Sequence, residues 1–316
     1  MADKGTDLEK AKAILTRGDL VAIPTETVYG LAANALDADA VAKIFSVKNR
    51  PDFDPLIVHV PDLDAVDLYV EFIPLKARRL ANLNWPGPLT LILQKRNSIP
   101  DIVTSGMDTV GIRCPDHVLT RDLLRALPFP LAAPSANPFG YVSPTRAEHV
   151  NEQLGDKIEY ILDGGPCSVG IESTIIGFEG ETPVIYRLGA LSIEKIESLI
   201  GKVEIKLNSS SNPKAPGQLK THYSPKKKMI LGNIDDLLTK HSSYSSGILS
   251  FSKDYNSPNQ KILSKQGNLE EAAKNLFNAL REFDTMDIDV VLAELVPDSG
   301  IGRAINDRLN RAAAEK

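Results

Sequence analysis

The sequence predicts an α/β fold with two domains. Short apolar segments alternate with helical patterns along the chain, and its 316 residues are enough for two separate cores. Hydrophobic residues make up 42% of the chain and charged residues 24%, a balance typical of soluble globular proteins. The composition changes near residue 203. We therefore expect a larger first domain, a linker and a smaller second domain.

In the first domain, run length and β-branching predict eight strands. These are Leu20–Pro24, Leu56–Val60, Leu89–Leu93, Thr109–Ile112, Leu131–Ala133, Tyr160–Leu162, Thr174–Phe178 and Val184–Tyr186. Apolar residues at helical spacing predict helices at Leu8–Arg17, Ala38–Ser46, Pro74–Asn82, Val118–Leu127 and Arg146–Leu154. Thr145 with Glu148 suits a capping box for the last of these, and Ser143 before Pro144 offers an alternative start. The mixture predicts a sheet of mixed strand direction.

The stretch from residue 203 to residue 228 is rich in Ser, Pro and Lys and poor in large apolar residues, as is typical of a linker. It holds six lysines against one acidic residue, Glu204, so its net charge is about +5. Beyond it, the patterns predict strands at Met229–Leu231, Gly247–Phe251 and Asp289–Leu295, and helices at Ile234–Leu238, Leu269–Phe283 and Gly302–Ala314. The alternation predicts a small unit of the βαβ kind.

Charge and composition exclude several functions. The formal net charge is −5, so we expect no strong direct nucleic-acid binding. Cys114 and Cys167 belong to no CxxC pair and are too few for a disulfide framework, so packing or incidental loop roles are expected. No apolar run approaches the roughly 20 residues that span a bilayer, and the start has no signal-peptide pattern. A cytoplasmic location without membrane contact is therefore expected.

The common nucleotide-binding and hydrolase motifs are absent from the sequence: there is no GxxxxGK[ST], GxGxxG, HExxH or GxSxG. Polar segments instead follow predicted strands, where open α/β sheets bind ligands. The first, Pro24–Leu31, gathers two threonine hydroxyls, a carboxylate and a phenol before Gly30. An ordinary turn explains Pro24 and Gly30 but not the cluster of polar groups, so the segment favours a ligand site.

Two basic segments allow more than one interpretation. Lys48 and Arg50 end a predicted helix, where they can cap its C-terminus or clamp a triphosphate, and residue type leaves both open. His59 lies on an apolar strand, which is by itself more typical of a core histidine. Arg113 ends another strand and can pair with a carboxylate, although a surface salt bridge is the more common role.

The loop Ala132–Pro138 carries small residues that permit close backbone approach, and its Ser and Asn side chains can bind phosphate or ribose. The helix start after Ser143 can receive an anion, but a plain surface loop stays equally open. The turn Asp163–Pro166 is predicted to be structural. Ser173 and Arg187, at a strand entrance and a strand exit, can face the same pocket.

Taken in order, these segments resemble the YrdC family of threonylcarbamoyl-AMP synthases. The resemblance rests on PTETVYGL, KNRP, PLIVHV, WPGPLTLIL, GIRCP, APSAN, SPT, DGG, ESTI and YRLG, over residues 7–200. The later APGQLKTHYSP is similar to the family's long two-domain form. The resemblance implies a YrdC-like domain with a twisted mixed sheet at 1–202, a basic linker at 203–228 and a Rossmann-like α/β domain at 229–316. Ala32 is a departure, because the family often has Gly there.

The resemblance also implies two groups of ligand-binding residues. Those that match threonine-binding positions are Thr27, His59, Arg113, Ala133 and Ser173. Those that match nucleotide-binding positions are Lys48, Arg50, Asp54, Thr109, Ser135, Asn137, Ser143, Arg187 and Tyr223. Lys48 and Arg50 would lie near the phosphates and are the expected catalytic residues.

The implied reaction is that of an L-threonylcarbamoyladenylate synthase, a nucleotidyltransferase that acts on L-threonine, bicarbonate and ATP. Its product would pass to tRNA-modifying transferase proteins for t6A modification. Mg²⁺ is expected with ATP, held mainly by substrate oxygens and water. We hypothesise that the linker covers the labile product from water.

Two alternatives remain for the function. One is a carbamoyl-transfer domain like that of hydrogenase-maturation proteins, but those are large chains with zinc-finger cysteines, and this chain has two cysteines. The other is an RNA-binding module, which the net charge of −5 and the absence of an aromatic or Arg-rich stripe disfavour.

Overall fold

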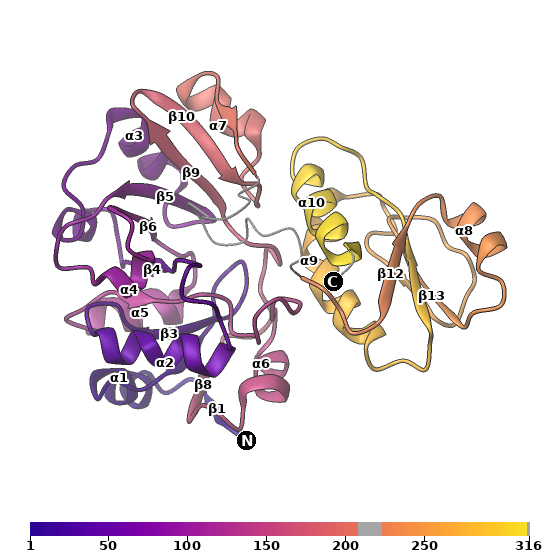
Figure 1. Cartoon of the computed structure of the whole chain (residues 1–316), viewed down its shortest axis with the longest axis horizontal. Helices are drawn as coiled ribbons and strands as arrows, with labels where there is room; N and C mark the ends of the chain where they lie inside the picture. The colour runs from indigo at the N-terminus through magenta and orange to yellow at the C-terminus, as the bar shows by residue number, and fades with distance from the viewer. Residues whose placement is uncertain (208–222, 315–316) are drawn as a thin grey trace.

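The computed structural model describes residues 1–207 and 223–314. It has two units, each built on its own β-sheet (Figure 1). The larger unit carries an eleven-stranded sheet and the smaller one a four-stranded sheet, both with helices packed against them. The predicted α/β class is therefore confirmed. No helix in the described ranges is long and apolar enough to cross a membrane.

The larger sheet is mixed, as predicted. Its strands lie in the order β1-β8-β2-β3-β7-β4-β6-β5-β9-β10-β11. Their bounds are β1 (Asp3–Gly5), β2 (Val21–Ile23), β3 (Gly30–Asn34), β4 (Ile57–His59), β5 (Leu89–Gln94), β6 (Thr109–Arg113), β7 (Leu131–Ala132), β8 (Tyr160–Leu162), β9 (Thr174–Glu179), β10 (Thr182–Arg187) and β11 (Glu204–Ile205). Parallel pairing of β4 with β6 places His59 opposite Arg113, and antiparallel pairing of β4 with β7 places His59 opposite Leu131. The ends of three strands thus meet at one place.

The helices of the larger unit are α1 (Leu8–Thr16), α2 (Ala38–Lys48), η1 (Asp64–Leu68), α3 (Leu75–Asn84), α4 (Asp101–Thr104), α5 (Val118–Ala126), α6 (Ala147–Leu154) and α7 (Ile193–Ile200). The Asp37 side chain begins α2 by accepting hydrogen bonds from the first backbone N–H groups. Asn49 ends it in the left-handed conformation, with a φ of 51°. Lys48 is therefore the last residue of the helix, and Arg50 belongs to the loop beyond it.

The predicted capping box of α6 is wrong. The helix begins after Arg146, whose side chain makes no cap hydrogen bond. Thr145 lies one residue too early, and its backbone N–H donates to Nδ1 of His149. The alternative cap is also unused, because the Ser143 hydroxyl donates to Glu172.

The smaller unit has the predicted βαβ organisation. Its strands are β12 (Lys228–Leu231), β13 (Ser246–Ser250), β14 (Gln260–Ile262) and β15 (Val290–Ala293), all parallel, in the order β12-β15-β13-β14. One face of this sheet carries α8 (Ile234–Lys240), and the other carries α9 (Leu269–Phe283) and α10 (Gly302–Ala313) (Figure 1). The extent of α9 matches the prediction.

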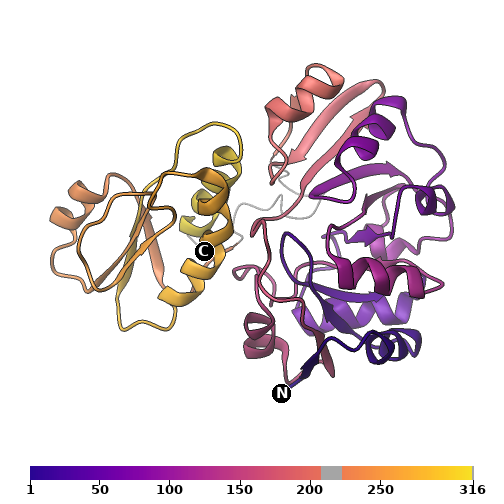
Figure 2. The same ribbon diagram turned by 180° about the vertical axis from the view of Figure 1, so that it is seen from behind.

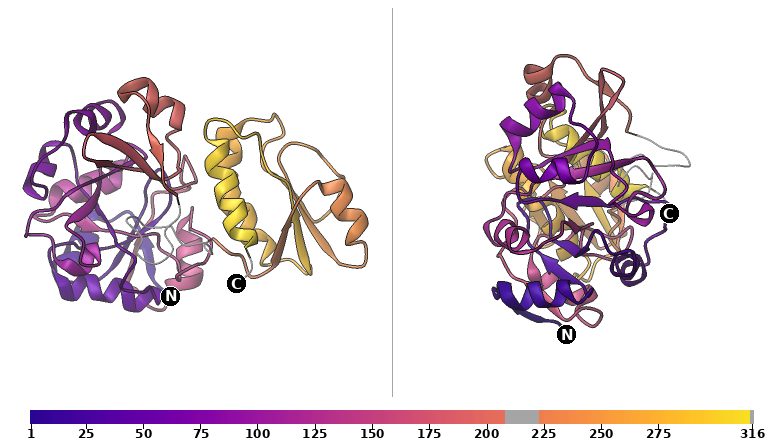
Figure 3. Two further views of the ribbon diagram at one scale, coloured as in Figure 1. Left: turned by 45° about the horizontal axis from the view of Figure 1, so that its top comes forward. Right: turned by 90° about the vertical axis from the view of Figure 1, so that its left-hand side faces the viewer.

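Helices α9 and α10 lie between the small sheet and the larger unit (Figures 2 and 3). Val28, Val142 and Ile171 of the larger unit share one apolar cluster with Phe277 and Leu309 of these helices. The two units are therefore packed through a common buried interface. Of the predicted linker, residues 208–222 lie outside the described ranges, whereas β11 within it adds an edge strand to the larger sheet.

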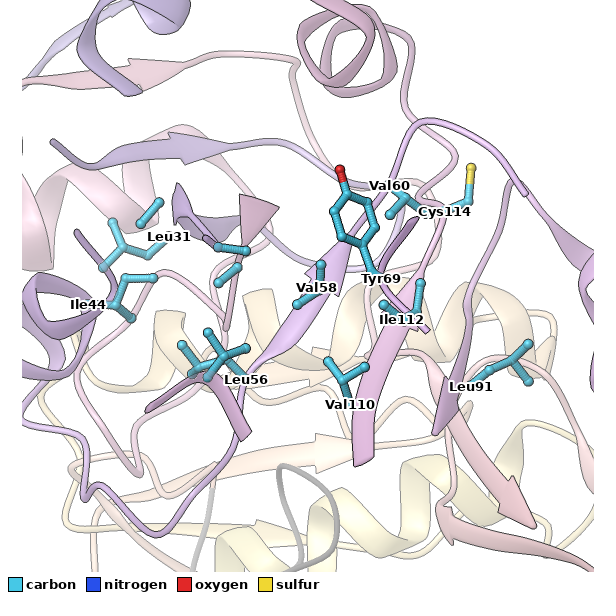
Figure 4. Close-up of a cluster of buried hydrophobic side chains, with 14 of the residues drawn as sticks. Leu31, Ile44, Leu56, Val58, Val60, Tyr69, Leu91, Val110, Ile112 and Cys114 are labelled. Atoms are coloured by element: carbon cyan, nitrogen blue, oxygen red, sulfur yellow. The ribbon is translucent and has the colours of Figure 1, made fainter. Parts of the chain in front are cut away.

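The core of the larger unit lies between its sheet and the covering helices (Figure 4). Leu31, Val58 and Ile112 point into it from three neighbouring parts of the sheet, and each is fully buried. Burial of such apolar surface is the main favourable contribution to folding. Cys114 and Cys167 belong to the same cluster as free buried residues, which confirms their expected packing role.

Candidate active site

A polar pocket lies where several strands of the larger sheet end. Its walls come mainly from the segments after β2, α2 and β7, from both ends of β4 and from the last residues of β6 and β10. The lining residues are Thr25, Val28, Gly30, Arg50, Ile57, His59, Arg113, Ala133, Pro134, Ser135, Glu172, Arg187 and Tyr223. Half of the sequence-predicted site residues are therefore at the wall.

Arg113, the last residue of β6, presents a buried cation to the pocket. Its side chain is 5% exposed, and Nη2 lies 2.7 Å from Oε2 of Glu26. The two groups form an ion pair by distance, but neither Nη2 nor Nε makes a well-directed hydrogen bond to another described residue. Buried donors without acceptors cost free energy, so a ligand with a planar anionic group would be stabilised here.

His59 lies beside Arg113 and is electrically neutral at neutral pH. Burial, followed by the positive charge of Arg113, lowers the pKa of His59 to about 3. Its Nδ1 lies 3.2 Å from the carbonyl oxygen of Ile57. The ring thus offers hydrogen bonding without a second positive charge, so it does not repel an amine bound next to Arg113.

The other residues predicted to bind threonine differ in their position relative to the pocket. Ala133 lines it, whereas Thr27 and Ser173 are fully buried behind the wall. The hydroxyl of Thr27 lies 2.9 Å from that of Thr25, which does line the pocket. Ser173 accepts a hydrogen bond from Arg187. In this structure Thr25, rather than Thr27, is the threonine at the wall.

Lys48 is buried and crosses from the end of α2 to the loop after β7. Its Nζ donates to the carbonyl oxygens of Ser135 and Asn137. Burial, and secondly the charge of Arg50, lowers the pKa of Lys48 well below its ordinary value. Lys48 holds this loop in place instead of capping α2, and its contact with phosphates stays a prediction.

Arg50 lines the pocket and is fixed by the chain just beyond it. Its Nη2 lies 2.9 Å from Oδ2 of Asp54, and its Nε and Nη2 donate to the carbonyl oxygens of Asp54 and Pro55. None of these acceptors belongs to α2, so the Arg50 side chain does not cap the helix, whereas its backbone N–H does by donating to the carbonyl oxygen of Phe45. Asp54 orients the guanidinium, and its Oδ1 has no hydrogen-bond partner among the described residues.

Arg187 is a third buried arginine of the pocket. Its Nε and Nη2 donate to the carbonyl oxygen of Ser173 at 3.1 and 3.0 Å. Burial lowers the pKa of Arg187 to about 10, which still leaves it positively charged at neutral pH. The pocket therefore contains three buried guanidinium groups, from Arg50, Arg113 and Arg187.

The remaining residues predicted to bind the nucleotide lie in different parts of the larger unit. Ser135 lines the pocket, and the Asn137 amide donates to the carbonyl oxygens of Pro138 and Tyr141 at 2.9 Å each. Thr109 starts β6, at the end opposite Arg113, and lines a smaller cavity that shares Ile57 with the pocket.

Sequence reasoning did not list two of the acids beside these cations, Glu26 and Glu172, as site residues. Glu26 faces Arg113, and Glu172 accepts hydrogen bonds from Ser143 at 2.6 Å and from Arg308 at 3.1 Å. A signal existed for Arg308, because it interrupts the apolar stripe of α10 between Ile305 and Leu309. Within the described ranges, no three His, Cys, Asp or Glu side chains are grouped as metal ligands.

Comparisons with known proteins identify the family. Residues 13–189 match the sequence family Sua5_yciO_yrdC, described as "Telomere recombination". The chain belongs to this family. Residues 191–314 match Sua5_C, described as "Threonylcarbamoyl-AMP synthase, C-terminal domain", so the chain is a member of the two-domain form. The resemblance seen in the sequence motifs is confirmed.

Two relatives that align over nearly the full length of the chain are both named threonylcarbamoyl-AMP synthase. The threonylcarbamoyl-AMP synthase of Pyrococcus abyssi is 40% identical over 318 residues, which cover 96% of this chain and 93% of that protein. That of Bacillus subtilis is 40% identical, with 97% and 92% covered. The crystal structure of P. abyssi Sua5 complexed with L-threonine aligns with a TM-score of 0.92 at 40% identity, over 97% of this chain and 94% of that one.

A more distant likeness concerns the fold alone. The structure of full-length HypF in the phosphate- and nucleotide-bound form is 23% identical, with a TM-score of 0.52, over 58% of this chain and 29% of that one. Relatives over the full length therefore favour the synthase over the carbamoyl-transfer alternative.

Proposed function

We propose that this member of the family is an L-threonylcarbamoyladenylate synthase, a nucleotidyltransferase that forms threonylcarbamoyl-AMP and pyrophosphate from L-threonine, bicarbonate and ATP. The names of the full-length relatives support the synthase activity. The observation that carries the proposal is the pocket lined by three buried arginines. One guanidinium suits an amino-acid carboxylate, and the other two suit phosphates.

In the first step, the threonine amine attacks the carbon of bicarbonate, and water leaves as the carbamate forms. Arg113 holds the threonine carboxylate, since its Nε and Nη2 have no other well-directed acceptor among the described residues. The neutral His59 ring lies beside it and tolerates the uncharged amine that this attack needs. The contribution of these residues is orientation, which can supply several kcal/mol.

In the second step, an oxygen of the carbamate attacks the α-phosphorus of ATP, and the bond to pyrophosphate breaks. Arg50 and Arg187 stabilise the negative charge on the phosphate oxygens, while Lys48 keeps the loop of Ser135 and Asn137 in place. The acids at the pocket each face a basic side chain, so we expect Mg²⁺ to be held by phosphate oxygens and water. When bound, it would neutralise phosphate charge. We expect the product to pass to tRNA-modifying transferase proteins for t6A formation.

Neither cysteine serves as a nucleophile in this proposal. Burial raises the pKa of Cys114 to about 11 and that of Cys167 to about 12, so both thiols stay protonated at neutral pH. We expect iodoacetamide at pH 8 to leave both unmodified in the folded protein and to modify both in denaturant, measured by mass spectrometry. Rapid alkylation of either thiol in the folded protein would contradict this environment.

The proposal is tested by pyrophosphate release with MgATP and bicarbonate, with and without threonine. Release should depend on threonine and fall when bicarbonate is depleted under a CO₂-free atmosphere. Pyrophosphate release at the same rate with and without threonine would overturn the proposed function. Filter binding of RNA over a salt series checks the RNA-binding alternative, because a phosphate-driven binder weakens steeply as salt rises.

A further inference from the structure

The C-terminal unit places one arginine at the back of the pocket. Arg308 of α10 has a fully buried side chain. Its Nε donates to Oε2 of Glu172 at 3.1 Å, and its Nη1 donates to Asp307. Glu172 belongs to the larger unit and lines the pocket. A buried ion pair therefore crosses from the second unit to the wall of the site.

Glu172 also contacts Ser143, on the nucleotide side of the pocket. Its other oxygen, Oε1, accepts a hydrogen bond from the hydroxyl of Ser143 at 2.6 Å. Both oxygens of the carboxylate are thus occupied, so Arg308 fixes the rotation of Glu172 and, through it, the Ser143 hydroxyl. A buried carboxylate that lost its cation would be destabilised and would shift.

Arg308 also contacts a second wall of the pocket. Its guanidinium lies 5.3 Å from the centre of the Tyr223 ring, within cation–π range. The same ring also stacks on Phe277 of α9, with ring centres 5.4 Å apart. Tyr223 is 1% exposed and has a positive φ of 65°, so packing holds it in an uncommon backbone conformation.

We propose that Arg308 is a positioning residue for the nucleotide side of the site, so that the C-terminal unit completes the pocket through Glu172 and Tyr223. This inference rests on the proposed function, since it assigns the Ser143, Arg187 and Tyr223 side of the pocket to ATP. Arg308 acts through these neighbours and not by touching the reacting atoms. The threonine side, around Arg113 and His59, is built from the larger unit.

Other contacts fasten the two units without reaching the pocket. Arg303 of α10 lies 2.6 Å from Glu194 of α7, with its side chain 33% exposed. The hydroxyl of Tyr141, in the larger unit, donates to Asp284, which follows α9. A role limited to holding the units together would make Arg308 equivalent to these residues. Arg303, on the same helix, therefore provides a matched control.

The test compares the full-length variants Arg308→Lys and Glu172→Gln with the control Arg303→Ala. Lysine keeps the charge but cannot hold Glu172 and face Tyr223 together, and glutamine keeps an acceptor for Ser143 but removes the ion pair. We expect each of the first two to raise the Kd for MgATP about tenfold, a loss of roughly 1.4 kcal/mol. The Kd for threonine should change by less than about twofold, and the control should change neither.

Calorimetry without bicarbonate measures both Kd values independently of turnover, and thermal melting reports whether each variant is folded. Unchanged ATP affinity in both folded variants, or equal weakening of ATP and threonine, would overturn the inference. If one variant does not fold, the other still tests the inference, because each removes one partner of the Arg308–Glu172 ion pair. If the wild-type protein binds ATP but releases pyrophosphate without threonine, the proposed function is wrong. The Kd values of the variants would still show whether Arg308 positions the nucleotide side.

Discussion

Replacing Arg113 with alanine should raise the KM for threonine by about 100-fold or more, while the KM for ATP changes by less than about threefold. The side chain is 5% exposed, and two of its nitrogens have no well-directed acceptor among the described residues. A buried charge-assisted pair with a carboxylate contributes about 2–4 kcal/mol to binding, and about 2.8 kcal/mol corresponds to 100-fold. Steady-state kinetics with each substrate varied in turn measures the effect.

Two variants separate the recognition role of Arg113 from a general loss of structure. Arg113→Lys keeps a positive charge beside Glu26 but loses the planar fork, so the KM for threonine should still rise about tenfold. Arg125→Ala removes an exposed arginine that pairs with Asp122 at 3.0 Å, and it should leave both KM values unchanged. If Arg113→Ala affected threonine and ATP equally, Arg113 would not be the carboxylate-binding residue.

Replacing Arg50 with alanine should raise the KM for ATP by about tenfold and lower kcat by about 100-fold, because removal of a transition-state charge contact costs about 3 kcal/mol. Arg50 is buried, lines the pocket and is held at 2.9 Å by Asp54. The threonine KM should change little, since the threonine side is built around Arg113. The same steady-state assay measures this variant.

Asp54→Asn is the matched variant for Arg50. It removes the charge that orients the guanidinium but leaves the arginine present, so we expect a smaller loss of kcat, about tenfold. A variant Arg50→Ala that raised the threonine KM while leaving the ATP KM unchanged would contradict the division of the pocket.

Strand and helix patterns were readable from the sequence wherever an element is long and apolar. The bounds of α9 and β8 match the prediction, and α10 ends one residue earlier than predicted. The strand β3 was not predicted, because Gly30–Asn34 contains no β-branched residue and gains its hydrogen bonds by pairing with β2 and β7. The short edge strands β1, β11 and β14 have only two or three residues, too few to show a period.

The candidate site was only partly readable, for a physical reason. Residue types located the cations Lys48, Arg50 and Arg113, and the family motifs divided them between two ligands. Which group each cation faces depends on contacts between distant parts of the chain. Lys48 bonds to carbonyl oxygens 87 and 89 residues away, and Arg308 meets a carboxylate 136 residues away. No local pattern encodes such pairs, so the structure was needed to find them.

The most direct test of the proposed reaction follows the carbon of bicarbonate. The protein is incubated with MgATP, L-threonine and ¹³C-labelled bicarbonate, and the products are separated quickly and analysed by mass spectrometry. We expect an adenylate that carries threonine and one ¹³C atom, formed together with pyrophosphate. An adenylate of threonine without the label, or AMP release with no threonine-containing adenylate in either wild-type protein or the Arg125→Ala control, would contradict the account.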